Sequence, residues 1–289
     1  THSLHFYYQY LQMIKKLLIC ATVVISSITT AQESTSSPYS FYGLGSLKFK
    51  GTVENRSMGG INVYSDSIHI NLGNPASYTG TNLAFYNNEA RPVKFALGTS
   101  FSSTTIETST ASDSYSNSAI DYLAVALPLN KFGLGFGVLP YSSVGYNLQS
   151  RNENNDLQYR YRGDGGINRA FVGFGYQVSK NLKIGVDTHY NFGNISNTSI
   201  AFGYNDFGEL LQFQSREVNR SDLGGFSFNF GTIFNKKINN SIELMVAASY
   251  SPEASIASKN QSEFSTIVID SDQTEFIVDS SIVDLELDN

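Results

Sequence analysis

The sequence predicts an all-β protein: an antiparallel transmembrane β-barrel, incomplete in this chain, with an N-terminal plug. Three observations lead to this fold class. Several segments alternate bulky apolar residues with glycine, polar or charged ones, most clearly from Leu182 to Phe192. Short turns alternate with longer polar connections, as in outer-membrane barrels. No stretch after Ile28 reaches the roughly 20 apolar residues of a spanning helix, so a membrane wall would have to be built from strands.

The N-terminal residues have the features of a secretory signal peptide and are left out of the fold prediction. Met13 is followed by two lysines, an apolar run from Leu17 to Ile25, and small residues up to Ala31. This order predicts a secretory signal peptide over residues 13–31, with residues 1–12 as upstream translated sequence. A transmembrane helix is the alternative, but the apolar run is shorter than a span requires.

Composition narrows the remaining classes. Cys20 is the only cysteine and lies inside the predicted signal, so the mature chain would have no disulfide and no thiolate ligand. Cleavage as a lipoprotein at Cys20 would leave an apolar stretch on the mature N-terminus, which argues against it. The chain has 20 Phe, 18 Tyr and 24 Gly, which suits lipid-facing rows and a crowded lumen. The net charge of -6 and the lack of a basic run argue against nucleic acid as a partner.

Two regions follow the signal. Residues 32–81 are rich in turn formers and show little alternation, which predicts a compact plug, or hatch. Residues 82–289 read as a partial outer-membrane barrel. Strands are expected first over 82–88 and 93–103, and the clearest hairpins are 119–129 with 132–149, 167–178 with 182–192, and 226–234 with 242–250.

The connections and the C-terminal part complete the topology. Long extracellular loops are expected over 150–166 and 193–225, opposite short periplasmic turns. Residues 263–270 and 274–279 are expected to be extracellular strand extensions. Because an open sheet edge is not tolerated in lipid, we expect the sequence to be a fragment that lacks its C-terminal strands.

Several motifs resemble outer-membrane proteins of the Bacteroidetes type related to the FadL family of hydrophobic-compound transporters. They are Ser37 to Gly45, Arg56 to Gly60, Asn74 to Tyr78, Gly165 to Asn168 and Tyr190 to Gly193. The resemblance covers most of the chain from Ser37 to about Ser251 and implies a fourteen-stranded barrel with an N-terminal hatch. It also implies that Asn74, Pro75 and Ala76 form the hatch motif and that a kink in a wall strand opens laterally.

Two further sets of residues are candidates for function. Five polar residues are expected to face the lumen as a network that holds the plug: Arg169, Lys183, Asp187, His189 and Glu243. Pro140 lies within a long expected strand and cannot donate a ladder hydrogen bond, so it is a candidate for a kink in the barrel wall. The alternative is that Pro140 lies at the membrane rim, where strand pairing is loose.

Catalytic and metal sites are weakly indicated. Asp187 and His189, with Ser227 or Ser249 nearby, would fit a barrel hydrolase, but polar lumen residues are expected in any barrel. The histidines outside the leader, His69 and His189, cannot build a metal site alone. We therefore expect no enzyme activity, no metal and no cofactor.

The predicted function is passive uptake of hydrophobic small molecules, such as fatty acids, across the cell outer membrane. The expected partners are outer-membrane lipid and the transported molecule, and the sequence leaves the oligomeric state open. The alternative is a structural, adhesin or secretion-accessory barrel without transport.

Overall fold

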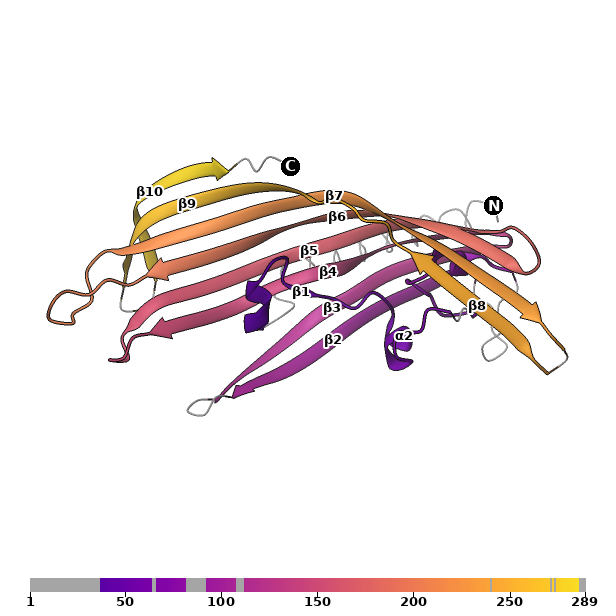
Figure 1. Cartoon of the computed structure of the whole chain (residues 1–289), viewed down its shortest axis with the longest axis horizontal. Coiled ribbons are helices and arrows are strands. Elements are labelled where there is room, and N and C mark those ends of the chain that lie inside the picture. Colours follow the sequence, from indigo (N-terminus) through magenta and orange to yellow (C-terminus); the bar gives the residue numbers. More distant parts are fainter. Residues whose placement is uncertain are drawn as a thin grey trace, which may run out of the picture.

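The computed structural model describes residues 37–63, 66–81, 92–107, 112–239, 241–270, 272 and 274–285. The predicted signal peptide, the upstream residues and the expected strand over 82–88 lie outside the described residues. Within them the chain forms one antiparallel sheet of ten strands (Figure 1). Among the helices of the described part, none has the length and apolar character needed to cross a membrane.

The strands follow one another across the sheet almost in chain order. The main path runs β10-β9-β7-β6-β5-β4-β3-β2, while β1 adds to β4 and β8 adds to β7. The elements are η1 (Pro38–Phe41), β1 (Ser46–Leu47), α2 (Val53–Ser57), η2 (Pro75–Tyr78), β2 (Lys94–Glu107), β3 (Ser112–Leu129), β4 (Phe132–Arg151), β5 (Leu157–Gln177), β6 (Leu182–Ala201), β7 (Gln214–Lys237), β8 (Glu243–Tyr250), β9 (Ala257–Ile269) and β10 (Glu275–Leu285).

The three predicted hairpins are present in the structure, and the registers that the alternation predicts for the first two are the ones observed. Leu129 pairs with Phe132 across the β3–β4 turn, Tyr176 pairs with Ile184 between β5 and β6, and Phe234 pairs with Val246 between β7 and β8. Since a slip by one residue would turn every apolar side chain to the other face, the hydrophobic pattern was sufficient to fix these registers.

The long loops expected over 150–166 and 193–225 are wrong. β4 continues to Arg151 and β5 begins at Leu157, so only residues 152–156 connect these two strands. β6 ends at Ala201 and β7 begins at Gln214, so the next connection consists of residues 202–213. Ladder hydrogen bonds join backbone groups and do not depend on apolar side chains, so strands can continue where both faces are polar. The sequence pattern signals only the part of each strand that has an apolar face.

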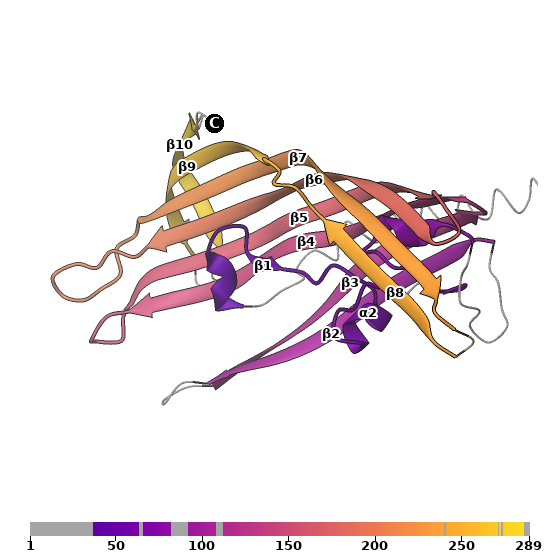
Figure 2. The same ribbon diagram turned by 45° about the vertical axis from the view of Figure 1, so that its right-hand side comes forward.

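The sheet has two unlike faces. On one, which we call the open face, large apolar side chains of β3 to β8 point away from the rest of the chain and are exposed, among them Phe136, Phe174, Ile184 and Phe228. On the other, the packed face, the same strands carry glycine and polar residues, and the N-terminal segment lies against them (Figures 1 and 2). In the described residues the sheet is not closed, so the predicted barrel stays a prediction.

The N-terminal segment follows the packed face along the strands. η1 lies by the far half of β4, where the Ser37 N–H donates to the Gly145 carbonyl (2.9 Å). β1 then pairs with β4 at Ser142 and Ser143, and the Val53 N–H, at the start of α2, donates to the Tyr122 hydroxyl (3.1 Å). η2 reaches the end of the sheet where the short turns lie. The described residues between 37 and 79 thus lie along the packed face from the middle of β4 to the end of the sheet with the short turns.

One strand of the sheet is interrupted. The first half of β7 pairs with β9 and its last eight residues pair with β8, and the residues between β8 and β9 leave the ladder. Gly225 faces this interruption, because a Cβ there would lie 2.7 Å from the Ser255 carbonyl oxygen. A second irregularity, between Pro140 and Ser142, shifts the register of β4 against β5.

Candidate functional site

Glycines on the packed face form a seat for η2. A Cβ on Gly185 would lie 2.5 Å from the Ala76 nitrogen and 2.8 Å from the Pro75 oxygen, and a Cβ on Gly175 would lie 2.8 Å from that same oxygen. Only residues without a side chain let the backbone of η2 come this close to the sheet. The glycine row of the wall and the Asn-Pro-Ala motif are therefore complementary surfaces.

Asn74 fixes η2 to this seat through its side-chain amide. Its Oδ1 accepts from the Ala76 N–H (3.0 Å), which caps the short helix. Its Nδ2 donates to the Thr232 carbonyl of β7 (3.1 Å) and to the Ala248 carbonyl of β8 (3.4 Å). Asn74 is 1% exposed, so each of these bonds replaces water that the group has lost.

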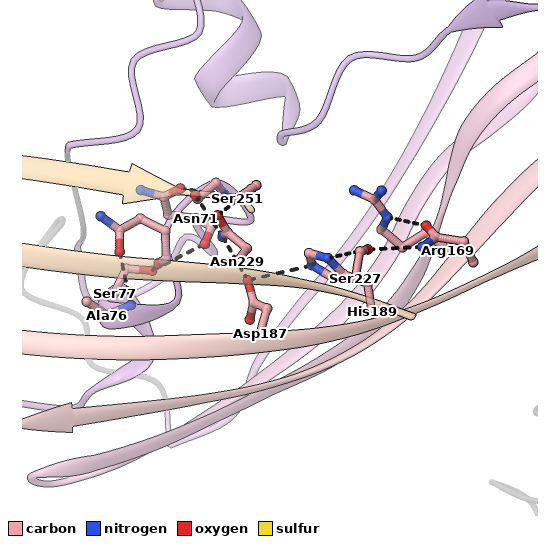
Figure 3. Close-up of polar contacts among 12 residues, drawn as sticks. Asn71, Ala76, Ser77, Arg169, Asp187, His189, Ser227, Asn229 and Ser251 are labelled. Carbon is pink, nitrogen blue, oxygen red and sulfur yellow. Dashed lines mark hydrogen bonds and ion pairs between the residues drawn. The ribbon is translucent and has the colours of Figure 1, made fainter. Parts of the chain in front are cut away.

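A chain of polar contacts continues from η2 along the packed face (Figure 3). The Asn229 amide donates to the Gly73 carbonyl (3.4 Å) and to Asp187 Oδ2 (3.3 Å). Asn229 Oδ1 accepts from the Ser251 hydroxyl (3.0 Å), at the interruption between β8 and β9. Asp187 Oδ2 lies 3.9 Å from His189 Nε2.

The chain ends at an arginine on β5. His189 Nδ1 is 3.5 Å from the Ser227 hydroxyl, which accepts from the Asn191 amide (3.0 Å). Asn191 Oδ1 accepts from Arg169 Nε (2.8 Å), and the Arg169 guanidinium stacks over the Tyr141 ring at 4.3 Å. We call the residues from Asn74 through Asp187 to Arg169 the polar chain.

The N-terminal segment also contributes charge to this region. Burial lowers the pKa of Lys50, the negative charge of Asp187 opposes that shift, and the positive charge of Arg169 adds to it. Burial and the adjacent charge of Asp187 raise the pKa of Tyr78 well above its usual value, so the phenol stays neutral. Asp187 is therefore surrounded by Lys50, Arg169, Tyr78 and Asn229, which compensate part of the cost of burying a carboxylate.

The structure brings together only part of the predicted lumenal network. Arg169, Asp187 and His189 belong to the polar chain. Lys183 lies on the packed face two residues before Gly185, is 5% exposed and takes no part in the chain. Glu243 is the first residue of β8, where it pairs with Lys237 next to the short β7–β8 turn, and it is exposed.

Pro140 lies at the register shift of β4, paired with Asn168, and lines a cavity of about 230 Å³ with residues of α2 and β3. The alternation along the strands puts Asn191 and Asn229 on the glycine-bearing face, but the sequence interpretation did not count either of them, or Ser251, among the candidate functional residues. A usable signal for Asn229 was its place between Phe228 and Phe230: a polar side chain there faces away from an aromatic row, toward the packed face.

The geometry does not favour hydrolysis. Ser227, His189 and Asp187 follow one another in the order of a catalytic triad, but the two contacts of 3.5 and 3.9 Å exceed the hydrogen-bond reach of about 2.6–3.2 Å between a nucleophile and its base. His189 and Asp187 are 3% and 1% exposed, so a substrate could not reach them in this conformation. Among the described residues no cluster of three or more His, Cys, Asp or Glu could hold a metal.

A second polar group lies where the N-terminal segment turns toward β2. The carboxylate of Asp66 contacts His69 Nδ1 (2.5 Å) and accepts from the backbone N–H groups of Ile68 (2.9 Å) and His69 (2.6 Å). Lys94 Nζ donates to the carbonyls of Asp66 (2.5 Å) and His69 (3.1 Å). Burial alone would raise the pKa of Asp66, but these hydrogen bonds outweigh it and lower that pKa.

Comparison with known protein families gives a match over most of the chain. A family model described as BamG matches residues 13–289. No curated protein matches, and no solved structure matches.

This match corrects the sequence interpretation. The resemblance to the FadL family is wrong, because nothing in the comparisons supports it. Uptake of hydrophobic molecules is wrong too, since the matched family points to outer-membrane protein assembly; the alternative, an accessory role without transport, is closer. The family is associated with the outer membrane, in agreement with the predicted location. Since the match extends over nearly the whole sequence, the chain belongs to the BamG family.

Proposed function

We propose that this protein is an accessory component of the machinery that assembles outer-membrane proteins. In this proposal it sits in the outer membrane as part of a β-barrel, with its own N-terminal segment as the plug. Membership of the BamG family is the observation that carries the proposal. The structure adds support on three points: a lipid-facing band, a filled packed face and the absence of an accessible reactive site in the polar chain.

The open face carries a band of the size that a membrane requires. On β6 the apolar side chains of the open face run from Leu182 to Phe192, with Ile184, Tyr190 and Phe192 exposed. This length is close to the 9–11 residues with which a tilted strand crosses a bilayer. The neighbouring strand β7 carries Phe226, Phe228 and Phe230 in the same band. Beyond the band the open face turns polar, with Arg220 paired to Asp222 and Arg216 to Glu263. This change along each strand favours lipid contact over a soluble core.

The packed face supports a closed lumen. η2 sits against backbone at the glycine seat, and Asn74 bonds to carbonyls of two strands. The polar chain next to it includes buried side chains of β6 and β7 that contact one another and the N-terminal segment, which favours a fixed structure over a permeation path. We infer that the barrel contributes surfaces for partners and not a conduit, and that it is not an enzyme.

A depletion experiment tests this proposal. When the gene is placed under a repressible promoter, depletion should lower the amounts of several unrelated outer-membrane barrels before growth stops, measured by quantitative proteomics of the outer membrane. Restoration by the wild-type gene, but not by a variant with Phe228→Lys and Phe230→Lys, would show that the membrane-inserted protein is required. Unchanged levels of all other barrels after depletion would refute the assembly role.

A further inference from the structure

The connection between β6 and β7 is a rigid projection. Asn205 organises its tip: its Oδ1 accepts from the N–H groups of Phe207 (3.0 Å) and Glu209 (2.9 Å), and its Nδ2 donates to the Glu209 carboxylate (2.9 Å). Tyr204 pairs with Leu210 as an isolated bridge, and the Gly203 N–H donates to Gln214 Oε1 (2.7 Å). The loop, residues 202–213, is therefore held by its own hydrogen bonds.

The loop is also tied to the sheet. The Tyr204 hydroxyl donates to the Leu157 carbonyl at the start of β5 (3.0 Å), and the Phe202 ring lies under the Arg160 guanidinium at 5.4 Å. Both views show the loop extending beyond the neighbouring β4–β5 connection (Figures 1 and 2). A loop fixed at both its base and its tip loses little conformational entropy when a partner binds.

This rigid loop presents apolar side chains to solvent. Phe207 is 89% exposed, and Leu210, Leu211 and Phe213 are each about half exposed. Single exposed apolar residues are ordinary, but four within one hydrogen-bonded loop favour an interaction site. Aromatic anchors that are fixed before binding are the residues that dominate protein interfaces.

The position of the loop excludes the bilayer as the occupant. β6 continues from Phe192, the last aromatic residue of the lipid-facing band, to Ala201 before the loop begins. At about 3.3 Å per residue and a strand tilt of about 40°, the tip lies on the order of 20 Å beyond the band. The patch must therefore be covered by something outside the hydrocarbon layer.

The charge of the loop points to the kind of partner. Residues 202–213 contain Asp206 and Glu209, both exposed at the tip beside Phe207, and no lysine or arginine. An apolar anchor with an acidic rim fits an apolar pocket with a basic rim. A second copy of this loop would instead bring the same carboxylates together.

We propose that the 202–213 loop docks into an apolar pocket, rimmed by lysine or arginine, on a different protein at the outer end of the barrel. This deepens the proposed function, on which it rests, because a component of an assembly machine must be held by other components. Phe207 is the main anchor, Leu210 and Leu211 add apolar contact, and Asp206 and Glu209 steer the encounter.

Site-specific photo-crosslinking in cells tests the proposal with the full chain. Benzoylphenylalanine at position 207 should give one discrete adduct, whereas the same group at Asn154, on the tip of the neighbouring β4–β5 connection, should not. The adduct's partner, identified by mass spectrometry, is then purified for affinity measurements. Phe207→Ser and Leu211→Ser should each weaken binding at least about tenfold, while Gln212→Ser, at an exposed polar position of the same loop, should not.

The electrostatic part has its own readout. Asp206→Lys together with Glu209→Lys should slow association about tenfold at low salt and reduce its salt dependence. An adduct with a second copy of this chain, an adduct with lipid, no adduct at 207, or a partner that binds the Phe207→Ser variant unchanged would each overturn the proposal. Depletion separates this result from the wider function: lost barrels without a 207 adduct refute the docking site alone, and a confirmed docking site with unchanged barrels refutes the assembly role alone.

Discussion

Adding one methyl group to the glycine seat should release the N-terminal segment from the sheet. In Gly185→Ala the new Cβ would lie 2.5 Å from both the Ala76 nitrogen and the Pro75 carbonyl carbon, where ordinary contact begins at 3.4 Å. These are backbone atoms, so no side chain can rotate away. η2 must retreat by roughly 0.9 Å, and overpacking of this kind costs about 1–3 kcal/mol.

The retreat should also break hydrogen bonds. Asn74 Nδ2 reaches Thr232 at 3.1 Å and Ala248 at 3.4 Å, and moving η2 would lengthen both beyond useful range. At about 0.5 kcal/mol for each of the two bonds, the low end of the range for an intramolecular hydrogen bond, the total comes to about 2–4 kcal/mol. With a factor of ten for each 1.4 kcal/mol, local opening of η2 should become roughly 30 to 700 times more frequent.

Hydrogen exchange measured by mass spectrometry on the protein in detergent micelles is the assay. The relevant amides are those of Ala76 and Ser77, both bonded to Asn74. Gly224→Ala is the matched control on β7, because its Cβ would meet only the Tyr190 hydroxyl, at 3.8 Å. If Gly185→Ala exchanges like Gly224→Ala in peptides covering residues 71–79, the glycine seat does not hold η2 and the reasoning is refuted.

Three further predictions concern the N-terminal segment and the band. Asn74→Ala should raise exchange of the same peptides about tenfold or more, because it removes the cap and both strand contacts; unchanged exchange would contradict the role of Asn74. The lowered pKa of Asp66 means that its contribution to stability is present above the unfolded value of about 3.9 and is lost as pH falls through the folded pKa. Protection of the backbone amides of residues 66–72 against hydrogen exchange should therefore decline below about pH 4 in the wild type and stay constant with pH in Asp66→Asn. The same pH dependence of protection in both proteins would contradict this role of Asp66. Phe228→Lys should lower folding stability in a bilayer by about 2–4 kcal/mol, measured by urea titration in vesicles. Val218→Lys, which lies beyond the band, should change stability little. Equal losses of stability in the two variants would show that Phe228 does not face lipid.

The sequence alone determined the strand pattern of the central sheet. Leu129 faces Phe132, and Tyr176 faces Ile184, because only that register puts every bulky residue on one face and every glycine on the other. The same alternation placed Arg169, Asp187 and His189 on one side of the sheet. The alternation could not reveal the strand extensions beyond Phe192. These extensions have polar residues on both faces, so their sequence shows no apolar–polar alternation and looks like that of a loop.

Only the tertiary structure decided which polar residues meet. Asn74 and Asn229 are far apart in the chain, and no local pattern states that Asn74 donates to the Thr232 carbonyl or that Asn229 donates to the Gly73 carbonyl. Lys183 shares a face with Asp187 and yet stays outside the polar chain, because position along a strand, and not face alone, sets the contacts. The exposed anchor at Phe207 likewise follows from a loop fold that long-range bonds to β5 hold in place. Periodicity is a local property of a sequence, whereas contacts between distant segments exist only after the chain has packed.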